Sequence, residues 1–231
     1  MTTQDDPLRD QLQTWPHHGR LGDHTTWRPE WTSCRPLVWW YLTFGHQPVV
    51  AEHALRAAAP LQPLPHVDVP PPEWLHLTMC EVGFRGQVDD QLLDAGVSAV
   101  RDALRGAAPL DLRLGPVNSL HDAVVLEARP LDRLRDLRAT LRGAMAEAGI
   151  DPVQRNESQF WPHVTIGYLN AEADHHVLMD EVGTRAAEVA TTPVPVTADR
   201  LELVEVTRAD RHYRWRTLGS VRLGRSLVSQ R

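Results

Sequence analysis

The chain has 231 residues, a formal net charge of −6, 42% hydrophobic residues and 23% charged residues. This composition is typical of a globular protein with a sizeable core, built as one domain or as two closely packed lobes. The acidic balance argues against binding of duplex DNA, which depends on many contacts between basic side chains and phosphates. No apolar run approaches 18 residues and no signal-peptide pattern opens the chain, so we expect neither a membrane span nor export.

All 24 basic residues are arginines, and the sequence contains no lysine. This excludes nucleotidyl-transfer ligases that attach AMP to a lysine, and it excludes a Walker-type phosphate loop. The only cysteines, Cys34 and Cys80, form no Cys-x-x-Cys motif and predict a reducing, cytoplasmic location.

Residues 1–36 are predicted to form an N-terminal extension that is polar and interrupted by prolines. Its tryptophans would hold it against the body of the protein: Trp15, Trp27 and Trp31. The neighbouring His17 and His18 are not accompanied by other residues at metal-ligand spacing, so we expect no metal site there.

Residues 37–231 are predicted to form the main domain, in two halves of roughly 37–116 and 117–224. In the first half, apolar periodicity and chain breakers predict strands over 37–44, 74–82 and 110–114, and helices over 48–59 and 89–105. The second half is predicted to have strands over 123–128, 161–169, 201–206 and 213–223, a helix over 131–148 and another within 172–189. This order looks like a duplicated strand-helix-strand unit.

Two six-residue stretches, 87 positions apart, share the pattern Trp-x-His-aliphatic-Thr-aliphatic: Trp74–Met79 and Trp161–Ile166. Alternate residues of a strand share a face, so the Trp, His and Thr of each stretch should project together. The residues between them, and Tyr168 further on, are expected on the buried reverse face. A third match, His24-Thr25-Thr26, has no strand pattern around it and is interpreted as chance.

The duplicated motif resembles the signature of the two-histidine phosphoesterase superfamily, a pair of His-aliphatic-Thr/Ser-aliphatic strands. This superfamily includes the LigT-like 2′-5′ RNA ligases and the 2′,3′-cyclic phosphodiesterases, and the resemblance covers about residues 35–224. It implies an α+β fold of two pseudo-symmetric lobes, with antiparallel-rich sheets and flanking helices around a central groove and with room for strand exchange. Sequence pattern by itself gives only the α+β class.

The resemblance implies four catalytic residues: His76, Thr78, His163 and Thr165. Two imidazoles on opposite sides of a phosphorus atom suit a general base and a general acid, because their ordinary pKa lies near neutral pH. The threonine hydroxyls would donate to the non-bridging oxygens, where charge builds up in the transition state. With one imidazole already protonated, no metal or other cofactor is required. Which histidine is the acid and which is the base stays open.

Five further residues are candidates for substrate binding: Trp74, Trp161, Tyr41, Arg85 and Arg155. The two tryptophans share the predicted face with the histidines and could stack a nucleobase, although packing within each lobe is an equal alternative. Tyr41, on the strand beside the first motif, is expected to line the groove. The two arginines flank the motifs and could steer a phosphate.

We therefore expect a metal-independent phosphoesterase that hydrolyses a 2′,3′-cyclic phosphate or a 2′-5′ phosphodiester of RNA or of a small nucleotide. Run backwards with an RNA 5′-hydroxyl, the same steps give a 2′-5′ RNA ligase. Two alternatives stay open. The same site could act on a cyclic dinucleotide or on a nucleotide of specialised metabolism, or the fold could be a binding module without turnover. The expected partner is a small nucleotide or an RNA end, and we expect a monomer.

Overall fold

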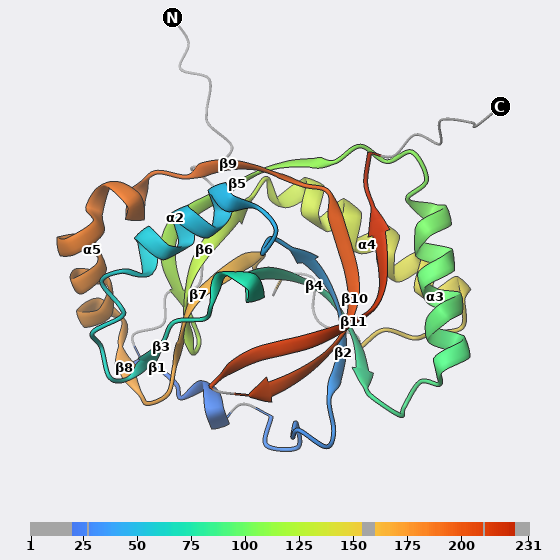
Figure 1. The fold of residues 1–231 in the computed structure, drawn as a ribbon, viewed down its shortest axis with the longest axis horizontal. Coiled ribbons are helices and arrows are strands. Elements are labelled where there is room, and N and C mark those ends of the chain that lie inside the picture. Colours follow the sequence, from blue (N-terminus) through green and yellow to red (C-terminus); the bar gives the residue numbers. More distant parts are fainter. Residues whose placement is uncertain (1–19, 27, 154–159, 210, 225–231) are drawn as a thin grey trace, which may run out of the picture.

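Nine strands form one curled, antiparallel sheet in the computed structural model, which describes residues 20–26, 28–153, 160–209 and 211–224 (Figure 1). The main strands run in the order β11-β10-β2-β4-β7-β6-β5-β9, and β3 pairs with the end of β7. Their bounds, in chain order, are β2 (Leu37–Thr43), β3 (Val67–Asp68), β4 (His76–Phe84), β5 (Leu110–Leu120), β6 (Ala123–Arg129), β7 (His163–Leu169), β9 (Val194–Ala198), β10 (Arg200–Ala209) and β11 (His212–Arg222). A separate two-stranded ribbon joins β1 (Arg20–Leu21) to β8 (Ala173–Asp174).

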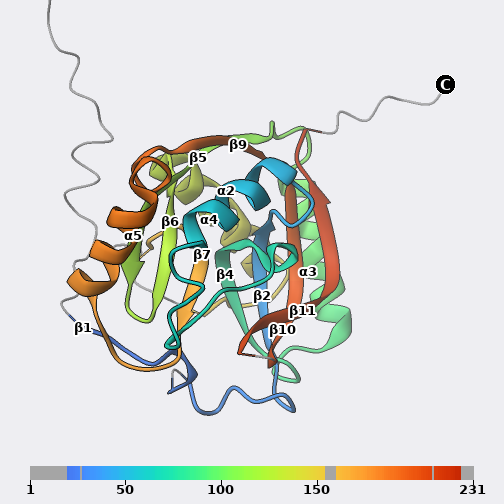
Figure 2. The same ribbon diagram turned by 60° about the vertical axis from the view of Figure 1, so that its left-hand side comes forward.

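In the described part of the chain, four α-helices cover the outer face of the sheet: α2 (Pro48–Ala58), α3 (Asp90–Ala103), α4 (Leu131–Glu147) and α5 (His175–Thr191). Helix α3 packs against α4 at one side, and α2 packs against α5 at the other (Figures 1 and 2). The start of α3 is fixed by Asp89, whose carboxylate accepts a hydrogen bond from the Leu92 N–H at 2.8 Å. No helix in the described part of the chain is long and apolar enough to cross a membrane.

The element order repeats. β2-α2-β4-α3 is followed by β6-α4-β7-α5, so each motif histidine begins the second main strand of its repeat. The predicted α+β class is confirmed. The strand pairings nevertheless cross the halves expected from the sequence, because β10 and β11 pair beside β2, and β5 pairs with β6 and β9. The sequence also predicted no strand over 194–198, where β9 lies.

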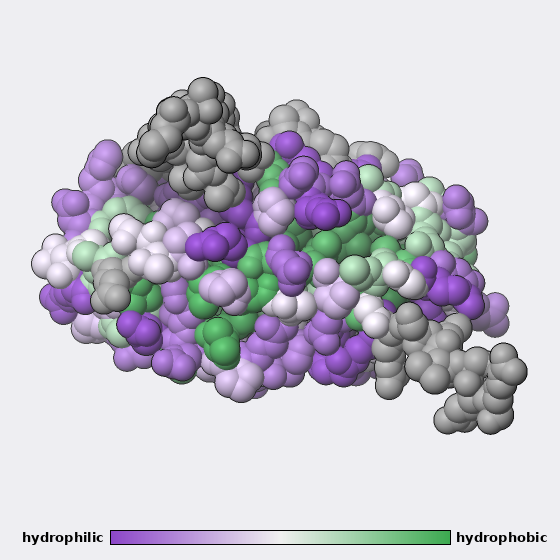
Figure 3. All heavy atoms as spheres, turned by 90° about the horizontal axis from the view of Figure 1, so that it is seen from above, coloured by the Kyte–Doolittle hydropathy of each residue, from purple (hydrophilic) through white to green (hydrophobic). Residues whose placement is uncertain are grey.

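The alternation of buried side chains along each strand creates two apolar clusters, one on each face of the sheet. On β2, Trp40 and Leu42 belong to the large cluster under the helices, whereas Trp39 and Tyr41 belong to a smaller cluster on the inner face. Seen from above, hydrophobic side chains reach the surface among hydrophilic ones (Figure 3). The large hydrophobic residues that are exposed in the described part are Val49, Leu55 and Val177.

Candidate active site

The two motif strands meet at the centre of the sheet. β4 and β7 pair antiparallel at Leu77 and Val164, both fully buried in the cluster under the helices. Strand alternation therefore directs the residues on either side of this pair to the inner face of the sheet. These residues are the four predicted catalytic ones: His76, Thr78, His163 and Thr165. The antiparallel pairing of two identical motifs gives the site an approximate twofold symmetry.

Each motif histidine is held by the backbone two residues before it. The Nδ1–H of His76 donates to the Trp74 carbonyl at 2.8 Å, and the Nδ1–H of His163 donates to the Trp161 carbonyl at 2.6 Å. A carbonyl oxygen can only accept, so both neutral rings carry their proton on Nδ1. The Nε2 atom is then the basic nitrogen of both imidazoles, as a proton-transfer role requires.

The motif tryptophans do not share the strand alternation that the sequence suggested, because β4 and β7 begin only at the histidines. Trp74 instead ends the short 3₁₀-helix η2 (Pro72–Trp74), and its indole packs edge-on against Trp215, with ring centroids 4.8 Å apart. Trp161 is half-buried and packs at the margin of the inner cluster. Both residues contact the histidines through their backbone carbonyls.

His76 lies in an aromatic environment. Its ring stacks on Tyr41, with centroids 4.0 Å apart, and meets the edge of Trp215 at 5.1 Å. The structure thus brings Tyr41 next to a motif histidine. Trp215 comes from β11, far from the motif in the chain, and no local pattern could have indicated this contact.

Burial lowers the pKa values of both motif histidines. The pKa of His76 falls to about 4, mainly through burial, with a smaller contribution from His163. Burial also lowers the pKa of His163, although the Trp161 carbonyl and the Asp122 carboxylate both oppose the shift. Both rings are therefore neutral at pH 7, which corrects the expectation that one imidazole is already cationic. A bound phosphate anion would raise both pKa values and would therefore favour protonation of one ring.

The hydroxyls of the two threonines each contact a tyrosine. Thr78 hydrogen-bonds Tyr41, and Thr165 hydrogen-bonds Tyr168; burial is the main cause that raises the pKa of both phenols, which keeps them protonated. The sequence predicted Tyr168 on the reverse face, which is wrong. A register shift between β6 and β7 lets the strand slip by one residue, so Tyr168 lies in the inner cluster.

Arg85, one of the two predicted arginines, does not reach the site. Arg85 lies just beyond β4, nine residues after His76 and so roughly 25–30 Å along the strand. It forms ion pairs with Asp90 and, at 2.9 Å, with Glu205. Arg155 falls outside the described residues, as do four residues of the predicted extension: Trp15, His17, His18 and Trp27.

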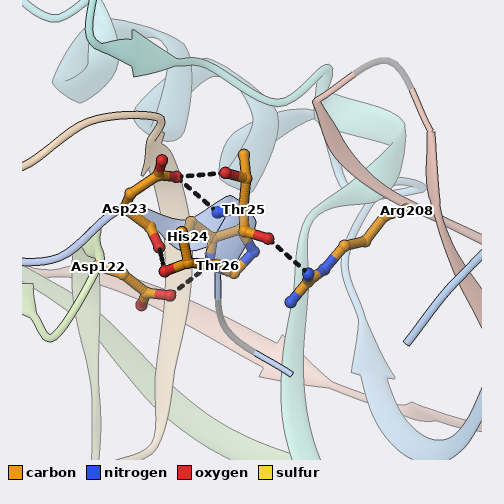
Figure 4. Close-up of polar contacts among 6 residues, drawn as sticks. All are labelled: Asp23, His24, Thr25, Thr26, Asp122 and Arg208. Atoms are coloured by element: carbon orange, nitrogen blue, oxygen red, sulfur yellow. Dashed lines mark hydrogen bonds and ion pairs between the residues drawn. The ribbon is translucent and has the colours of Figure 1, made fainter. Parts of the chain in front are cut away.

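The N-terminal segment contributes a histidine that the sequence analysis set aside. His24 lies in the 3₁₀-helix η1 (His24–Thr26) and is 8% exposed. Its Nδ1 atom lies 2.5 Å from an Asp122 carboxylate oxygen (Figure 4). Its ring centroid lies 4.5 Å from that of Tyr168. The contact partners are about 100 residues away in the chain or more, so no local signal marks His24 as part of the site.

A buried carboxylate also lies beside His163. Glu127 is the cross-strand partner of His163 and is fully buried. Its two oxygens accept hydrogen bonds from Asn118 at 2.9 Å and from Arg129 at 2.8 Å, so its charge is balanced within the sheet. Among the described residues, no group of three or more His, Cys, Asp or Glu side chains is arranged to hold a metal ion.

Comparison with known proteins identifies the fold. The structure is similar to TT0787 of Thermus thermophilus, with a TM-score of 0.60 and 18% identity over 81% of this chain and 98% of that one. It is similar to E. coli LigT, with a TM-score of 0.59 and 17% identity over 83% and 99% of the two chains. The MHV ns2 PDE domain gives a TM-score of 0.52 and 12% identity over 74% and 98%. No curated protein matches the sequence.

The family follows from the sequence itself. The model of the 2′-5′ RNA ligase superfamily matches residues 48–210, which hold both His-x-Thr motifs and most of the sheet. The match spans well over half of the chain, and the solved structures share its arrangement of strands and helices. The protein therefore belongs to the 2′-5′ RNA ligase superfamily, the two-histidine phosphoesterases.

Proposed function

We propose that the protein is a phosphodiesterase that opens 2′,3′-cyclic phosphates, or cleaves 2′-5′ phosphodiesters, of RNA ends and small nucleotides without a metal ion. The observation that carries the proposal is the matched pair of His-x-Thr units on one face of the sheet. Both imidazoles have Nδ1 tied to a carbonyl, which leaves Nε2 of each available for proton transfer. Related solved structures of E. coli LigT hold 3′-AMP and phosphate, which fits a small phosphorylated nucleotide as ligand.

The reaction needs two proton transfers on opposite sides of phosphorus. One neutral imidazole takes a proton from water as the water oxygen forms a bond to phosphorus. The bond from phosphorus to one ribose oxygen then breaks, and the second imidazole, protonated, gives its proton to that oxygen. The hydroxyls of Thr78 and Thr165 stabilise the charge on the non-bridging oxygens. With an RNA 5′-hydroxyl as the acceptor in the reverse direction, the same groups would form a 2′-5′ linkage.

The surroundings of the two histidines differ, and we use the difference to propose their roles. His76 is packed between aromatic rings, and its pKa is lowered to about 4, which keeps it neutral and suits the base. Burial lowers the pKa of His163 as well, but the Asp122 carboxylate opposes this shift, and for this reason we propose His163 as the acid. Substrate binding would add a negative charge and favour protonation of His163 further.

The experiment that tests the proposal is a panel of 2′,3′-cyclic nucleotides and of 2′-5′- and 3′-5′-linked oligonucleotides, followed by phosphorus NMR. We expect turnover of the cyclic phosphates or of the 2′-5′ linkage, and an unchanged rate after exhaustive treatment with EDTA. Loss of turnover in EDTA with recovery in Zn²⁺ or Mn²⁺ would show that the mechanism is wrong. No turnover of any member of the panel would overturn the proposed activity.

A further inference from the structure

The two outermost strands of the sheet differ in length, although the main strand order is balanced about the central β4–β7 pair. β2, β10 and β11 follow β4 on one side, and β6, β5 and β9 follow β7 on the other. β11 has 11 residues and pairs with the whole length of β10. β9 has five residues and pairs only with Leu110–Leu114 of β5. The β10–β11 hairpin is therefore longer than the pair of strands that takes its place on the other side.

The far half of this hairpin is directed over the inner face of the sheet. The pairing of β10 with β11 shifts register between Leu203 and Val204, and both strands bend near their middle (Figures 1 and 2). A bulge of this kind bends a strand and increases its twist. Beyond the bend, Tyr213 of β11 belongs to the inner cluster, and Trp215 packs against it. The hairpin thus brings two aromatic side chains to the face that holds the motif residues.

Trp215 packs against His76 and against the two aromatic residues beside it. Its ring centroid lies 5.1 Å from that of His76, 5.4 Å from that of Tyr41 and 4.8 Å from that of Trp74. The three interplanar angles are 78°, 85° and 75°, so every contact is edge to face, as aromatic pairs prefer. The imidazole is also held by the stacked Tyr41 ring and by its Nδ1 hydrogen bond to the Trp74 carbonyl. Together these contacts restrict rotation of the His76 ring.

His163 lacks this enclosure. Its Nδ1 makes the equivalent backbone hydrogen bond, but no aromatic ring in the described part of the chain stacks on it or meets its edge. Val125 of β6 takes the place that Tyr41 has on β2. His163 is half-buried, whereas His76 is 6% exposed. The two copies of the motif therefore have unequal surroundings, and the hairpin supplies part of the difference.

We propose that the β10–β11 hairpin makes the two motif histidines unequal, with Trp215 as a positioning residue that keeps water from His76 and holds it as the base. The inference rests on the proposed function for the role of the base, and it names the element that decides which histidine takes that role. Two copies of one motif supply two similar imidazoles, whereas hydrolysis needs a base and an acid. An aromatic side chain that covers only one of them distinguishes the two.

Trp215 acts through the hydration of His76. Burial is the main cause that lowers the pKa of His76 to about 4. The buried carboxylate on the same strand, Glu81, acts on Tyr41 and forms an ion pair with Arg28. Water that replaces a shortened Trp215 side chain would hydrate the imidazolium and raise this pKa. The titratable side chains that face the His76 ring are not carboxylates: Tyr41 of β2, Tyr213 of β11 and His163 of β7.

Proton NMR titration of the histidine rings tests the inference without any substrate. The signals of His76 and His163 are identified by their loss in His76→Gln and His163→Gln. Between about pH 4.5 and pH 8, Trp215→Leu should raise the pKa of His76 by about 1 pH unit or more and leave that of His163 in place. Trp215→Phe keeps an aromatic edge and should stay near the wild type. Phe84→Leu removes a ring that packs against the same inner cluster, at the far end of β4, and should move neither pKa.

The pH–rate profile on a 2′,3′-cyclic nucleotide tests the role of Trp215 in the reaction. In Trp215→Leu, the acid limb should move to higher pH together with the pKa of His76. The plateau value of kcat should fall by about 10-fold or more, because an imidazole that is free to rotate is less well placed for proton transfer. KM should change by less than about 2-fold. Trp215→Phe should recover most of kcat, and circular dichroism establishes that each variant is folded.

The outcomes separate failure of this inference from failure of the proposed activity. Equal rises in the pKa values of both histidines, or no rise in either, would overturn the inference. A change confined to KM would also overturn it, since that result marks Trp215 as a substrate contact. If no cyclic nucleotide or oligonucleotide is turned over, the proposed activity fails, and the NMR titration still decides whether the hairpin makes the histidines unequal.

Discussion

The imidazole of His76 stacks on the phenol ring of Tyr41, with ring centroids 4.0 Å apart and ring planes inclined by 18°. Trp215 meets the same imidazole with its edge, and only 6% of His76 is exposed. An imidazolium in this environment would lose its hydration, and no carboxylate is among the main groups that act on its pKa. Protonation of His76 and burial of His76 therefore oppose each other.

This opposition predicts a loss of stability in acid. The pKa of His76 is about 4 in the folded protein and 6.5 in its ordinary state, so the unfolded chain binds the proton more readily. The contribution of neutral, buried His76 to the free energy of unfolding is fully present above pH 6.5. It is lost as the pH falls to about 4. At about 1.4 kcal/mol for each pH unit, His76 should cost about 3 kcal/mol of the free energy of unfolding over this interval.

Urea unfolding between pH 7.5 and pH 4 would measure this effect, with His76→Gln as the variant. The variant should show a shallower dependence of its free energy of unfolding on pH than the wild type. His176→Gln, at an exposed position of α5, controls for the loss of any histidine and should follow the wild type. If the free energy of unfolding depends on pH in the same way for the wild type and for His76→Gln, the lowered pKa of His76 is not the cause of the loss of stability.

The two motif histidines should behave as one catalytic unit. We expect His76→Ala and His163→Ala each to remove most of the activity, because the reaction needs both proton transfers. The double variant should lose little more than either single variant. Steady-state kinetics on a cyclic nucleotide would measure this. Losses that multiply, or full activity in either single variant, would show that the histidines do not act together.

The threonine hydroxyls should matter mainly in the transition state. Thr78→Val and Thr165→Val keep the shape of the side chain and delete the donor. Each should raise the barrier to kcat by about 2–4 kcal/mol, as removal of an oxyanion donor does elsewhere. KM should change much less, because the oxygens gain charge mainly in the transition state. The matched control is Thr140→Val on the exposed side of α4, which should leave both constants unchanged.

Asp122 should set the alkaline limb of the pH–rate profile. We expect a bell-shaped profile that rises as His76 loses a proton and falls as His163 loses one, with apparent pKa values that belong to the pair. Asp122 acts to raise the pKa of His163, so Asp122→Asn should move the alkaline limb to lower pH.

The acid limb should stay in place in Asp122→Asn, because Asp122 is not among the groups that act on His76. Asp199→Asn, which removes a carboxylate paired with Arg222 away from the site, is the control for net charge. An alkaline limb that stays in place or moves to higher pH in Asp122→Asn would reverse the assignment of His163 as the acid.

Local order along the chain was enough to predict the family, the α+β class and the position of both His-x-Thr strands. The alternation of side chains along a strand is a property of neighbouring residues, and a duplicated pattern is visible without a structure. The alternation argument held between each histidine and its threonine. The alternation argument failed at the ends of the motif stretches. Trp74 precedes its strand, and a register shift turns Tyr168 to the other face of the sheet.

The surroundings of the histidines, by contrast, come from the packing of distant segments. His24 meets Asp122, Trp215 meets His76, and both contacts join residues that are about 100 positions or more apart in the chain. Arg85, adjacent to the first motif in sequence, is carried away from the site by the extended strand, at about 3.3 Å for each residue. Within one strand, residues that are far apart in the chain are also far apart in space. Between strands, residues that are far apart in the chain can lie in contact. The motif and the packing of the N-terminal segment through Trp31 were therefore predictable, whereas the contact of His24 with Asp122 and the aromatic environment of the histidines were not.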